Sequence, residues 1–293
     1  MIRTVRKNNR TQILLEIPGK IFSLMQHELI VISDTSENES YDAPDEDIWV
    51  SFNSFELGHY ERCVLLRKGA WFNDELINAY FAILAYQHPE HYFMNTFFVT
   101  KLTRSGVSGV IRWANPVKVS QSKIVFIPVN LNNAHWILVI VEPFKREITL
   151  LDSMATNSRP HKILNCINDY FVQVIDPILF EPNEKSNPVG FLAFQLSGLR
   201  LNEIKKKKRP GKDCNYDFKL AIDIPQQEDG GSCGTFVCKF ASLLAASQEK
   251  IEQPRRQNND DFHLHSASFN QTDVDKFRMH LHNLFEKHNG IQF

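Results

Sequence analysis

A cysteine within a glycine-rich stretch is the first residue of this sequence with evident chemical potential. The stretch "PQQEDGGSCGTFVCKFASLL" contains Cys233 near its centre, and apolar residues follow it at steps of three and four. This spacing predicts a helix with Cys233 at or just before its first turn. The unpaired N–H groups and the dipole at a helix start favour a thiolate over a thiol. A small buried hydrophobe is the alternative for a lone cysteine, and the presence of a base decides between the two.

His135 is the histidine best placed to be that base. It opens the apolar run "HWILVIV" after the polar turn "NLNNA", so its ring can face a cleft while the strand is buried. Asp152 ends the next expected strand, "TLLD", and a hairpin of the two strands places it beside His135. A carboxylate there fixes the tautomer of the imidazole. Gln227, six residues before Cys233, offers an amide donor that can stabilise an oxyanion together with the Cys233 N–H.

The elements around these residues predict an α+β fold. Strands are expected at 123–130, 135–143, 146–154 and 218–225, the last of which leads into the Cys233 loop. Helices are expected at 71–87, 161–175 and 272–288, and Asn73 or Asp74 can cap the first of them. Residues 247–271 are polar and are expected to form a loop.

Composition limits the class of protein. The 293 residues carry a net charge of −1, so no overall field favours nucleic acid or a membrane surface as a partner. The five cysteines are an odd, scattered set, which predicts reduced thiols in an intracellular protein, and the lack of a CxxC pair argues against zinc. Residues 1–47 hold little that could build a core. They are predicted to be an extension with an acidic linker, before a single domain at 48–293.

Five sequence blocks, in order, resemble those of the Ulp/SENP family of papain-like cysteine proteases. These blocks are "WFND" (Trp71–Asp74), "MNTFFVTKL" (Met94–Leu102), "IPVNLNNAHW" (Ile127–Trp136), "LLDS" (Leu150–Ser153) and "PQQEDGGSCG" (Pro225–Gly234). The family processes and removes SUMO and related ubiquitin-like proteins. The resemblance implies a central mixed β-sheet flanked by helices and a reaction without metal or cofactor.

The resemblance also implies roles for individual residues. Cys233 matches the family's nucleophile, His135 its base, Asp152 the orienting acid and Gln227 the oxyanion-hole residue. Two tryptophans and an acid match substrate-binding positions, which are Trp71, Trp136 and Asp74. In the family the two indoles close a narrow tunnel over the substrate's terminal Gly-Gly, which excludes larger residues. Plain core packing is the alternative for each tryptophan.

Two residues before the nucleophile depart from the family pattern. Ser232 stands where the family commonly has Asp, and Gly231 stands where many members have an aromatic residue. Neither belongs to the catalytic set, so we expect the chemistry to survive. These two changes instead affect the stiffness of the loop and its contacts with the substrate tail.

Two further segments suggest partners and location. Ile30, Val31 and Ile32 with the acids after them resemble a SUMO-interaction motif, in which a short strand adds to the edge of a partner's sheet. An ordinary edge strand is the alternative. The basic run at Lys205–Lys212 predicts a protein of the nucleus, with the cytoplasm as a second location. A solvated loop or a basic rim facing acidic substrates are the alternatives for this run.

The function expected from the whole sequence is that of a cysteine isopeptidase or endopeptidase. It is expected to act as a monomer and to cleave after the C-terminal Gly-Gly of SUMO, in conjugates, in the precursor or in both. The alternatives are the same chemistry on NEDD8 or another ubiquitin-like protein, acyl transfer to a protein side chain, and a SUMO-binding module whose catalysis has decayed.

Overall fold

The chain divides into two compact units, residues 1–47 and residues 48–293, in a computed structural model. The structure describes residues 48–154, 160–180, 215–247, 264 and 268–293, together with four strands within 2–34. These four strands form an antiparallel sheet in the first unit, with the order β1 (Ile2–Lys7), β2 (Arg10–Ile17), β3 (Lys20–Met25) and β4 (Glu28–Asp34). Ile30, Val31 and Ile32 therefore lie on β4, a strand at one edge of this sheet.

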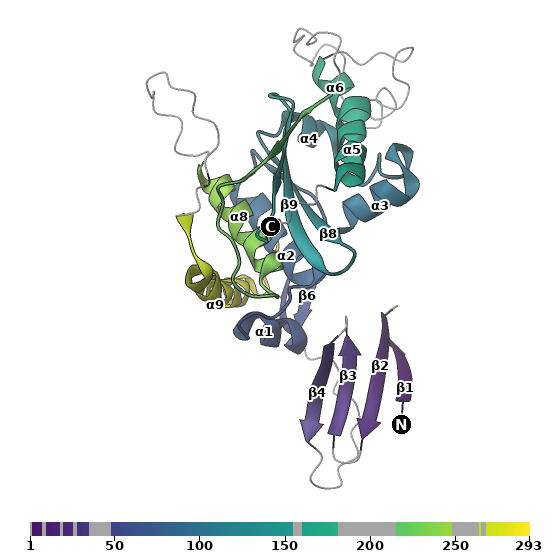
Figure 1. Cartoon of the computed structure of the whole chain (residues 1–293), viewed down its shortest axis with the longest axis vertical. Helices are drawn as coiled ribbons and strands as arrows, with labels where there is room; N and C mark the ends of the chain where they lie inside the picture. Colours follow the sequence, from purple (N-terminus) through teal and green to yellow (C-terminus); the bar gives the residue numbers. More distant parts are fainter. Residues whose placement is uncertain are drawn as a thin grey trace. The chain divides into compact units, whose positions relative to one another are not determined.

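A mixed five-stranded sheet forms the centre of the second unit (Figure 1). Its order is β11 (Asp217–Leu220), β10 (Glu147–Leu151), β9 (His135–Glu142), β8 (Val125–Leu131) and β7 (Tyr92–Phe93). The three middle strands are antiparallel and the two edge strands pair in parallel. The α+β prediction with a central mixed sheet is confirmed.

The strand predicted over 218–225 is wrong in its second half. The ladder to β10 ends with the bond from the Ala221 N–H to the Leu150 carbonyl, and β11 itself stops at Leu220. The apolar residues after it continue the alternation of a strand, but Pro225 has no N–H to donate to a ladder. Residues 221–232 instead form the irregular segment that carries the chain to Cys233.

Helices cover both faces of the sheet. Alternate residues of β9 enter different cores: Trp136, Leu138 and Ile140 pack on one face, and Ile137, Val139 and Val141 pack on the other. The first core also receives α2 (Asp74–Gln87), α8 (Cys233–Ser247) and α9 (Gln271–His288). The second receives α3 (Phe97–Ser105), α4 (Pro116–Gln121) and α5 (His161–Tyr170). This arrangement explains why the sequence of β9 is continuously apolar.

Further short elements complete the unit. They are β5 (Ile48–Phe52), β6 (Phe55–Gly58), α1 (His59–Leu66), a 3₁₀ turn at Val107–Gly109, a π-helical turn at Phe171–Ile175 and α6 (Asp176–Phe180). The cap of α2 is Asn73, whose side chain accepts the Leu76 N–H at 3.0 Å, so Asp74 is the first helical residue. Within the described part of the chain, no helix is long and apolar enough to cross a membrane.

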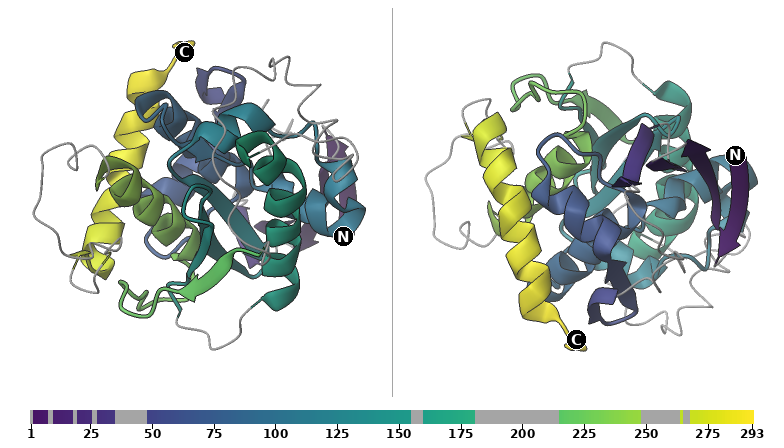
Figure 2. Two further views of the ribbon diagram at one scale, coloured as in Figure 1. Left: turned by 90° about the horizontal axis from the view of Figure 1, so that it is seen from above. Right: turned by 90° about the horizontal axis from the view of Figure 1, so that it is seen from below.

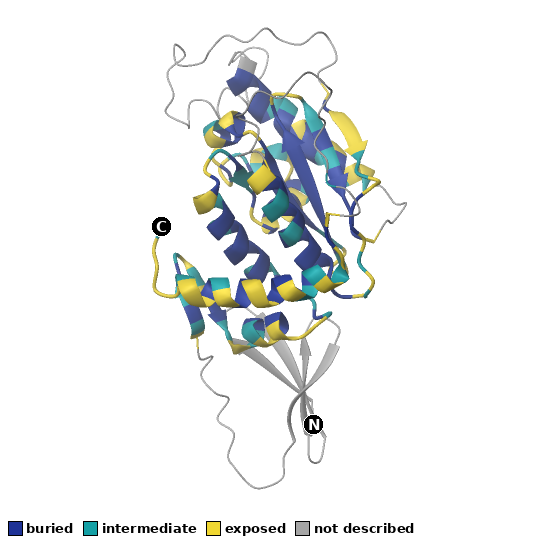
Figure 3. Cartoon of the chain, turned by 90° about the vertical axis from the view of Figure 1, so that its left-hand side faces the viewer, coloured by how far each residue is buried: buried dark blue, intermediate teal, exposed yellow. Residues whose placement is uncertain are grey.

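The helix α9 lies beside α1 and α8 (Figure 2). A capping box between Asn270 and Asp273 starts it, and one face is buried while the other is exposed (Figure 3). Arg278 is on the buried face and is only 1% exposed. The helix predicted over 272–288 is confirmed, whereas most of the loop predicted at 247–271 lies outside the described residues.

Candidate active site

The antiparallel register of β9 and β10 brings a histidine and an acid together. Leu138 pairs with Leu151, so the residue after β10 lies near the start of β9. His135 Nε2 donates to Asp152 Oδ1 at 2.7 Å, and both side chains are largely buried, at 12% and 6% exposure. The Met154 N–H donates to the same carboxylate oxygen at 2.9 Å, which fixes the orientation of the acid.

The surroundings of His135 favour the imidazolium. Burial of the ring opposes the charge, but the Asp152 carboxylate and the Cys233 sulfur outweigh it, and together they raise the pKa of His135 to about 9. The second ring nitrogen, Nδ1, is buried and makes no well-formed hydrogen bond in the structure. Because Nε2 is used by Asp152, Nδ1 is the nitrogen available to the sulfur.

Cys233 is the first residue of α8 and is 1% exposed. The Ser232 carbonyl accepts the Phe236 N–H at 2.9 Å, which places Ser232 at the cap position of this helix. The helix start is packed closely, since a Cβ on Gly234 would lie 2.7 Å from Phe72 Cβ and 3.3 Å from Trp136 Cδ1. Glycine at this position therefore lets α8 approach the two aromatic residues.

The two tryptophans lie on opposite segments next to this helix start. Trp136 belongs to the core, with 3% exposure, and its Nε1 donates to the Phe72 carbonyl at 3.0 Å. Trp71 is half-buried, and its Cδ1 lies 2.8 Å from the position of a Cβ on Gly231. The absence of a side chain at Gly231, noted as a departure from the family, is thus required by contact with residues 69–72, here called the Trp71 segment.

Gln227 is tied to the residue after Asp152. Its N–H donates to the Ser153 carbonyl at 2.8 Å, and the Ser153 hydroxyl donates to Gln227 Oε1 at 2.6 Å. Gln227 Nε2 donates one proton to the Asp229 carbonyl at 2.7 Å, which leaves the second amide proton for a ligand. The sequence analysis named Gln227 but missed Ser153, although Ser153 stands directly after Asp152 in the "LLDS" block.

Sequence reasoning also missed the residues that hold the loop before Cys233. Asp229 accepts hydrogen bonds from the N–H groups of Gly231 and Ser232. Arg278, from α9, reaches the Ser232 hydroxyl at 3.5 Å. A sequence signal for Arg278 exists, because it falls on the same helix face as the apolar stripe of α9 (Val274, Phe277, Leu281 and Phe285).

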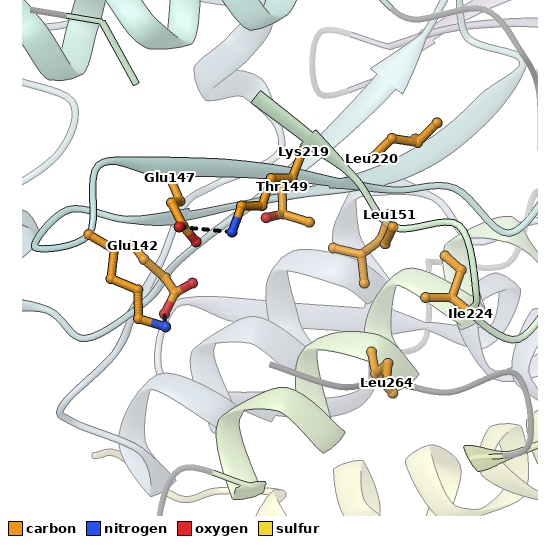
Figure 4. Close-up of a pocket in the computed structure, with 10 residues that line it drawn as sticks. Glu142, Glu147, Thr149, Leu151, Lys219, Leu220, Ile224 and Leu264 are labelled. Atoms are coloured by element: carbon orange, nitrogen blue, oxygen red, sulfur yellow. Dashed lines mark ion pairs between the residues drawn. The ribbon is translucent and has the colours of Figure 1, made fainter. Parts of the chain in front are cut away.

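The described structure also contains a cavity away from this site. It measures about 160 Å³ and lies along the edge of the sheet formed by β10 and β11 (Figure 4). Two ion pairs of 2.8 Å line one end, Lys145–Glu142 and Lys219–Glu147, and apolar side chains including Leu151 line the other. No residue of the proposed catalytic set lines this cavity.

Comparisons with known proteins agree with the arrangement. The profile of the Ulp1 protease family, C-terminal catalytic domain, matches residues 70–289. Sentrin-specific protease 2 of Homo sapiens is 28% identical over 185 residues, which is 61% of this chain and 26% of that protein. Ubiquitin-like-specific protease 1 of Saccharomyces cerevisiae is 28% identical over 173 residues, which is 57% of this chain and 22% of that protein. The matches thus span about a quarter of the length of these relatives.

The fold is also that of solved structures. The C-terminal Ulp1 protease domain in complex with SMT3, the yeast ortholog of SUMO, superposes with a TM-score of 0.57 at 21% identity, over 84% of this chain and 90% of that one. The SUMO protease Ulp1 with its catalytic cysteine oxidized to a sulfinic acid gives 0.54 at 22% identity, over 80% and 84%. With the family profile covering most of the chain, this protein belongs to the Ulp1 protease family, as its sequence motifs predict.

Proposed function

We propose that this chain is a cysteine isopeptidase that cleaves after the C-terminal Gly-Gly of SUMO, in conjugates, in the precursor or in both. The observation that carries the proposal is the buried Cys233 at a helix start beside His135, whose other nitrogen donates to Asp152 at 2.7 Å. Membership of the Ulp1 protease family and similarity to a protein named sentrin-specific protease 2 support the substrate class.

In the proposed mechanism Cys233 attacks the carbonyl carbon after the Gly-Gly. The sulfur–carbon bond forms as the carbonyl electrons move to oxygen, and the free Gln227 amide proton and the Cys233 N–H stabilise that oxyanion. The His135 imidazolium then protonates the leaving amine as the carbon–nitrogen bond breaks. Neutral His135 takes a proton from water as the water oxygen attacks the thioester carbon. The carbon–sulfur bond breaks, which restores the Cys233 thiolate and the His135 imidazolium, and the SUMO carboxylic acid loses its proton to solvent.

Asp152 has a positioning role in this scheme. Its carboxylate keeps the proton of His135 on Nε2 and stabilises the imidazolium, so that Nδ1 exchanges protons with the sulfur and the leaving group. We assign substrate binding to Trp71, Trp136 and Asp74, with the indoles closing over the Gly-Gly. The placement of Trp71 and Trp136 on segments next to the start of α8 supports this assignment.

The rival functions differ in substrate or in class. The same site acting on NEDD8 or another ubiquitin-like protein uses identical chemistry, because the triad does not read the body of the substrate. A decayed SUMO-binding module would bind without turnover. The ordered His135–Asp152 pair and the packed Gln227 favour an active enzyme over the decayed module.

Electrophilic probes separate these functions. We would mix the protein with SUMO, NEDD8 and ubiquitin, each bearing a C-terminal electrophile, and read the intact mass for the wild type and for Cys233→Ala. We expect an adduct with SUMO that disappears in the variant. An adduct only with NEDD8 or ubiquitin would overturn the substrate, and SUMO binding without any adduct would indicate the binding module.

We further propose that the protein acts as a monomer in the nucleus and uses β4 to bind SUMO. The basic run Lys205–Lys212, which suggests the location, lies outside the described residues. The position of Ile30, Val31 and Ile32 at a sheet edge supports strand addition, and it equally fits an ordinary edge strand. Loss of nuclear fluorescence after replacing Lys205–Lys208 with Gln, and weaker SUMO binding by Ile30→Ala/Ile32→Ala in the Cys233→Ala background, are the expected results.

A further inference from the structure

A buried cation connects three segments that are distant in sequence. Arg278 Nη1 donates to the Val64 carbonyl at 3.1 Å, and Nη2 donates to the Ala70 carbonyl at 2.5 Å. Nη2 also reaches the Ser232 hydroxyl at 3.5 Å, and the guanidinium lies 4.9 Å from the centre of the Phe72 ring. One side chain from α9 thus joins the end of α1, the Trp71 segment and the loop before Cys233.

The same loop contains the counter-charge. Asp229 Oδ1 accepts the N–H groups of Gly231 at 3.0 Å and Ser232 at 2.8 Å, and Oδ2 accepts the Ser232 hydroxyl at 2.7 Å. Burial opposes ionisation of this acid, but these donors and the charge of Arg278 hold its pKa below the ordinary value. Ser232 therefore lies between the carboxylate and the guanidinium and contacts both.

A second residue of α9 contacts this loop. Gln271 Nε2 donates to Asp229 Oδ2 at 3.1 Å and reaches the Ser232 hydroxyl at 3.3 Å, while its Oε1 accepts the Glu228 N–H at 3.0 Å. Gln271 and Arg278 are seven residues apart, so they lie on the same face of the helix. The loop is held along two turns of α9.

Arg278 is buried with both terminal nitrogens hydrogen-bonded, while its Nε has no hydrogen-bond partner among the described residues. A guanidinium that is 1% exposed is destabilising unless it is paired and hydrogen-bonded. Burial lowers the pKa of Arg278 to about 10, with Asp229, Asp275 and Cys233 opposing that fall, so the side chain stays charged at neutral pH. Cys233 is the next residue after Ser232, and any shift of Ser232 moves both its sulfur and its N–H.

We infer that Asp229, Ser232 and Arg278 form a positioning cluster that sets the place of Cys233 relative to His135 and the Trp71 segment. Asp229 fixes the loop from within, and Arg278 fixes it to the Trp71 segment through Ser232 and Ala70. These are positioning residues, since none of them reacts. A displacement of the nucleophile by about 1 Å can lower the rate of an enzyme roughly 100-fold, which is the scale of effect at issue.

The test changes the charge of the cluster and then restores it at another residue. Asp229→Asn keeps the size of the side chain and removes the charge, and we expect kcat to fall about 10- to 100-fold with KM changed less than about threefold. In Asp229→Asn/Ser232→Asp the new carboxylate stands within reach of Arg278, and we expect kcat to return to within about fivefold of the wild type. Asp275→Asn is the matched control. It removes an acid of α9 that pairs with the exposed Lys68 at 3.1 Å and that, among the described residues, has no hydrogen bond to the loop before Cys233, and we expect it to change kcat less than about twofold.

The inference rests on the proposed function for its kinetic assay, so a second readout is independent of the substrate. The rate at which iodoacetamide alkylates Cys233, followed by peptide mass, should fall in Asp229→Asn and recover in the double variant. If wild-type Cys233 is alkylated but SUMO is not cleaved, the proposed function fails while the alkylation rates still test the cluster. The cluster is overturned if Asp229→Asn matches the wild type in these assays, if the double variant is no better than the single one, or if Asp275→Asn loses as much activity.

Discussion

The two halves of the active site are held in different ways. His135 and Asp152 are placed by one hairpin, and the register of β9 and β10 brings them within 2.7 Å. Cys233 follows an irregular loop, and its position depends on side chains from α9, on the Trp71 segment and on hydrogen bonds within the loop. The proposed base is thus fixed by local pairing, whereas the proposed nucleophile is fixed by contacts with residues that are far away in sequence.

The two halves should therefore tolerate different substitutions. The backbone ladder of a hairpin does not depend on any single side chain, so substitutions there act mainly through the reacting groups themselves. A loop fastened by side chains loses its geometry when one contact is removed. Mutations that disturb activity without touching the substrate should therefore concentrate on the nucleophile side.

The largest expected effect is on the base side. Asp152→Asn should lower kcat by about 10²- to 10⁴-fold, because the tautomer and the charge of His135 are no longer supported. Steady-state cleavage of a SUMO conjugate measures this effect. Asp176→Asn is the control, since Asp176 is also a buried acid but contacts Arg146 and Tyr216 away from the site. A similar loss of kcat in Asp176→Asn would show that the loss in Asp152→Asn comes from damage to the fold and not from the missing support of His135.

The pH profile of activity tests the role of the same His135–Asp152 pair. The pKa of His135 is raised to about 9, so the imidazolium that protonates the leaving amine is present below that pH and is lost above it. Activity should therefore fall on the alkaline side with a midpoint near 9, and the stability that the ion pair contributes should be complete below about 6.5 and lost as the pH rises through about 9. In Asp152→Asn the alkaline limb should move to lower pH, and an unchanged limb would contradict this assignment.

On the nucleophile side, adding one methyl group should have an intermediate effect. A Cβ on Gly231 would lie 1.8 Å from the Gly69 carbonyl oxygen and 2.8 Å from Trp71 Cδ1, so Gly231→Ala must push the two segments apart. We expect a loss of about 1–3 kcal/mol in the free energy of unfolding, measured with urea. Gly230→Ala is the matched control, because nothing lies within 4 Å of its added Cβ. Equal stability of the two variants would refute the close packing of this loop.

The smallest expected effect concerns the link between the two halves. Ser153→Ala removes the 2.6 Å hydrogen bond to Gln227 Oε1, and the freer amide should lower kcat about tenfold with little change in KM, which corresponds to about 1.4 kcal/mol. Ser122→Ala serves as the control, since Ser122 is equally buried and bonds only to its own helix turn at Lys118. A fall in kcat no greater than that of the control would show that Ser153 does not position the Gln227 amide.

The features that could be predicted from the sequence follow the same division between the hairpin and the loop before Cys233. The apolar strand from His135 and the strand ending before Asp152 were predictable because period and turn are local properties of the chain. The start of α8 at Cys233 was predictable for the same reason. The Asp229–Arg278 cluster was not, because no local pattern reports a contact between Ser232 and a residue 46 positions later. The second half of the strand at 218–225 was wrongly predicted, because an alternating pattern does not show where the partner's hydrogen bonds end.

The position of Arg278 in the chain also has a consequence for biosynthesis. Ser232 leaves the ribosome 46 residues before Arg278, so Cys233 emerges well before the side chain that contacts its loop. At about 5–20 residues per second, this interval lasts roughly 2–9 seconds. A nascent chain with His135, Asp152 and Cys233 already outside the ribosome would still lack the contacts of Arg278 with Ala70 and Ser232. The loop before Cys233 would then be fastened only after Arg278 has emerged as well.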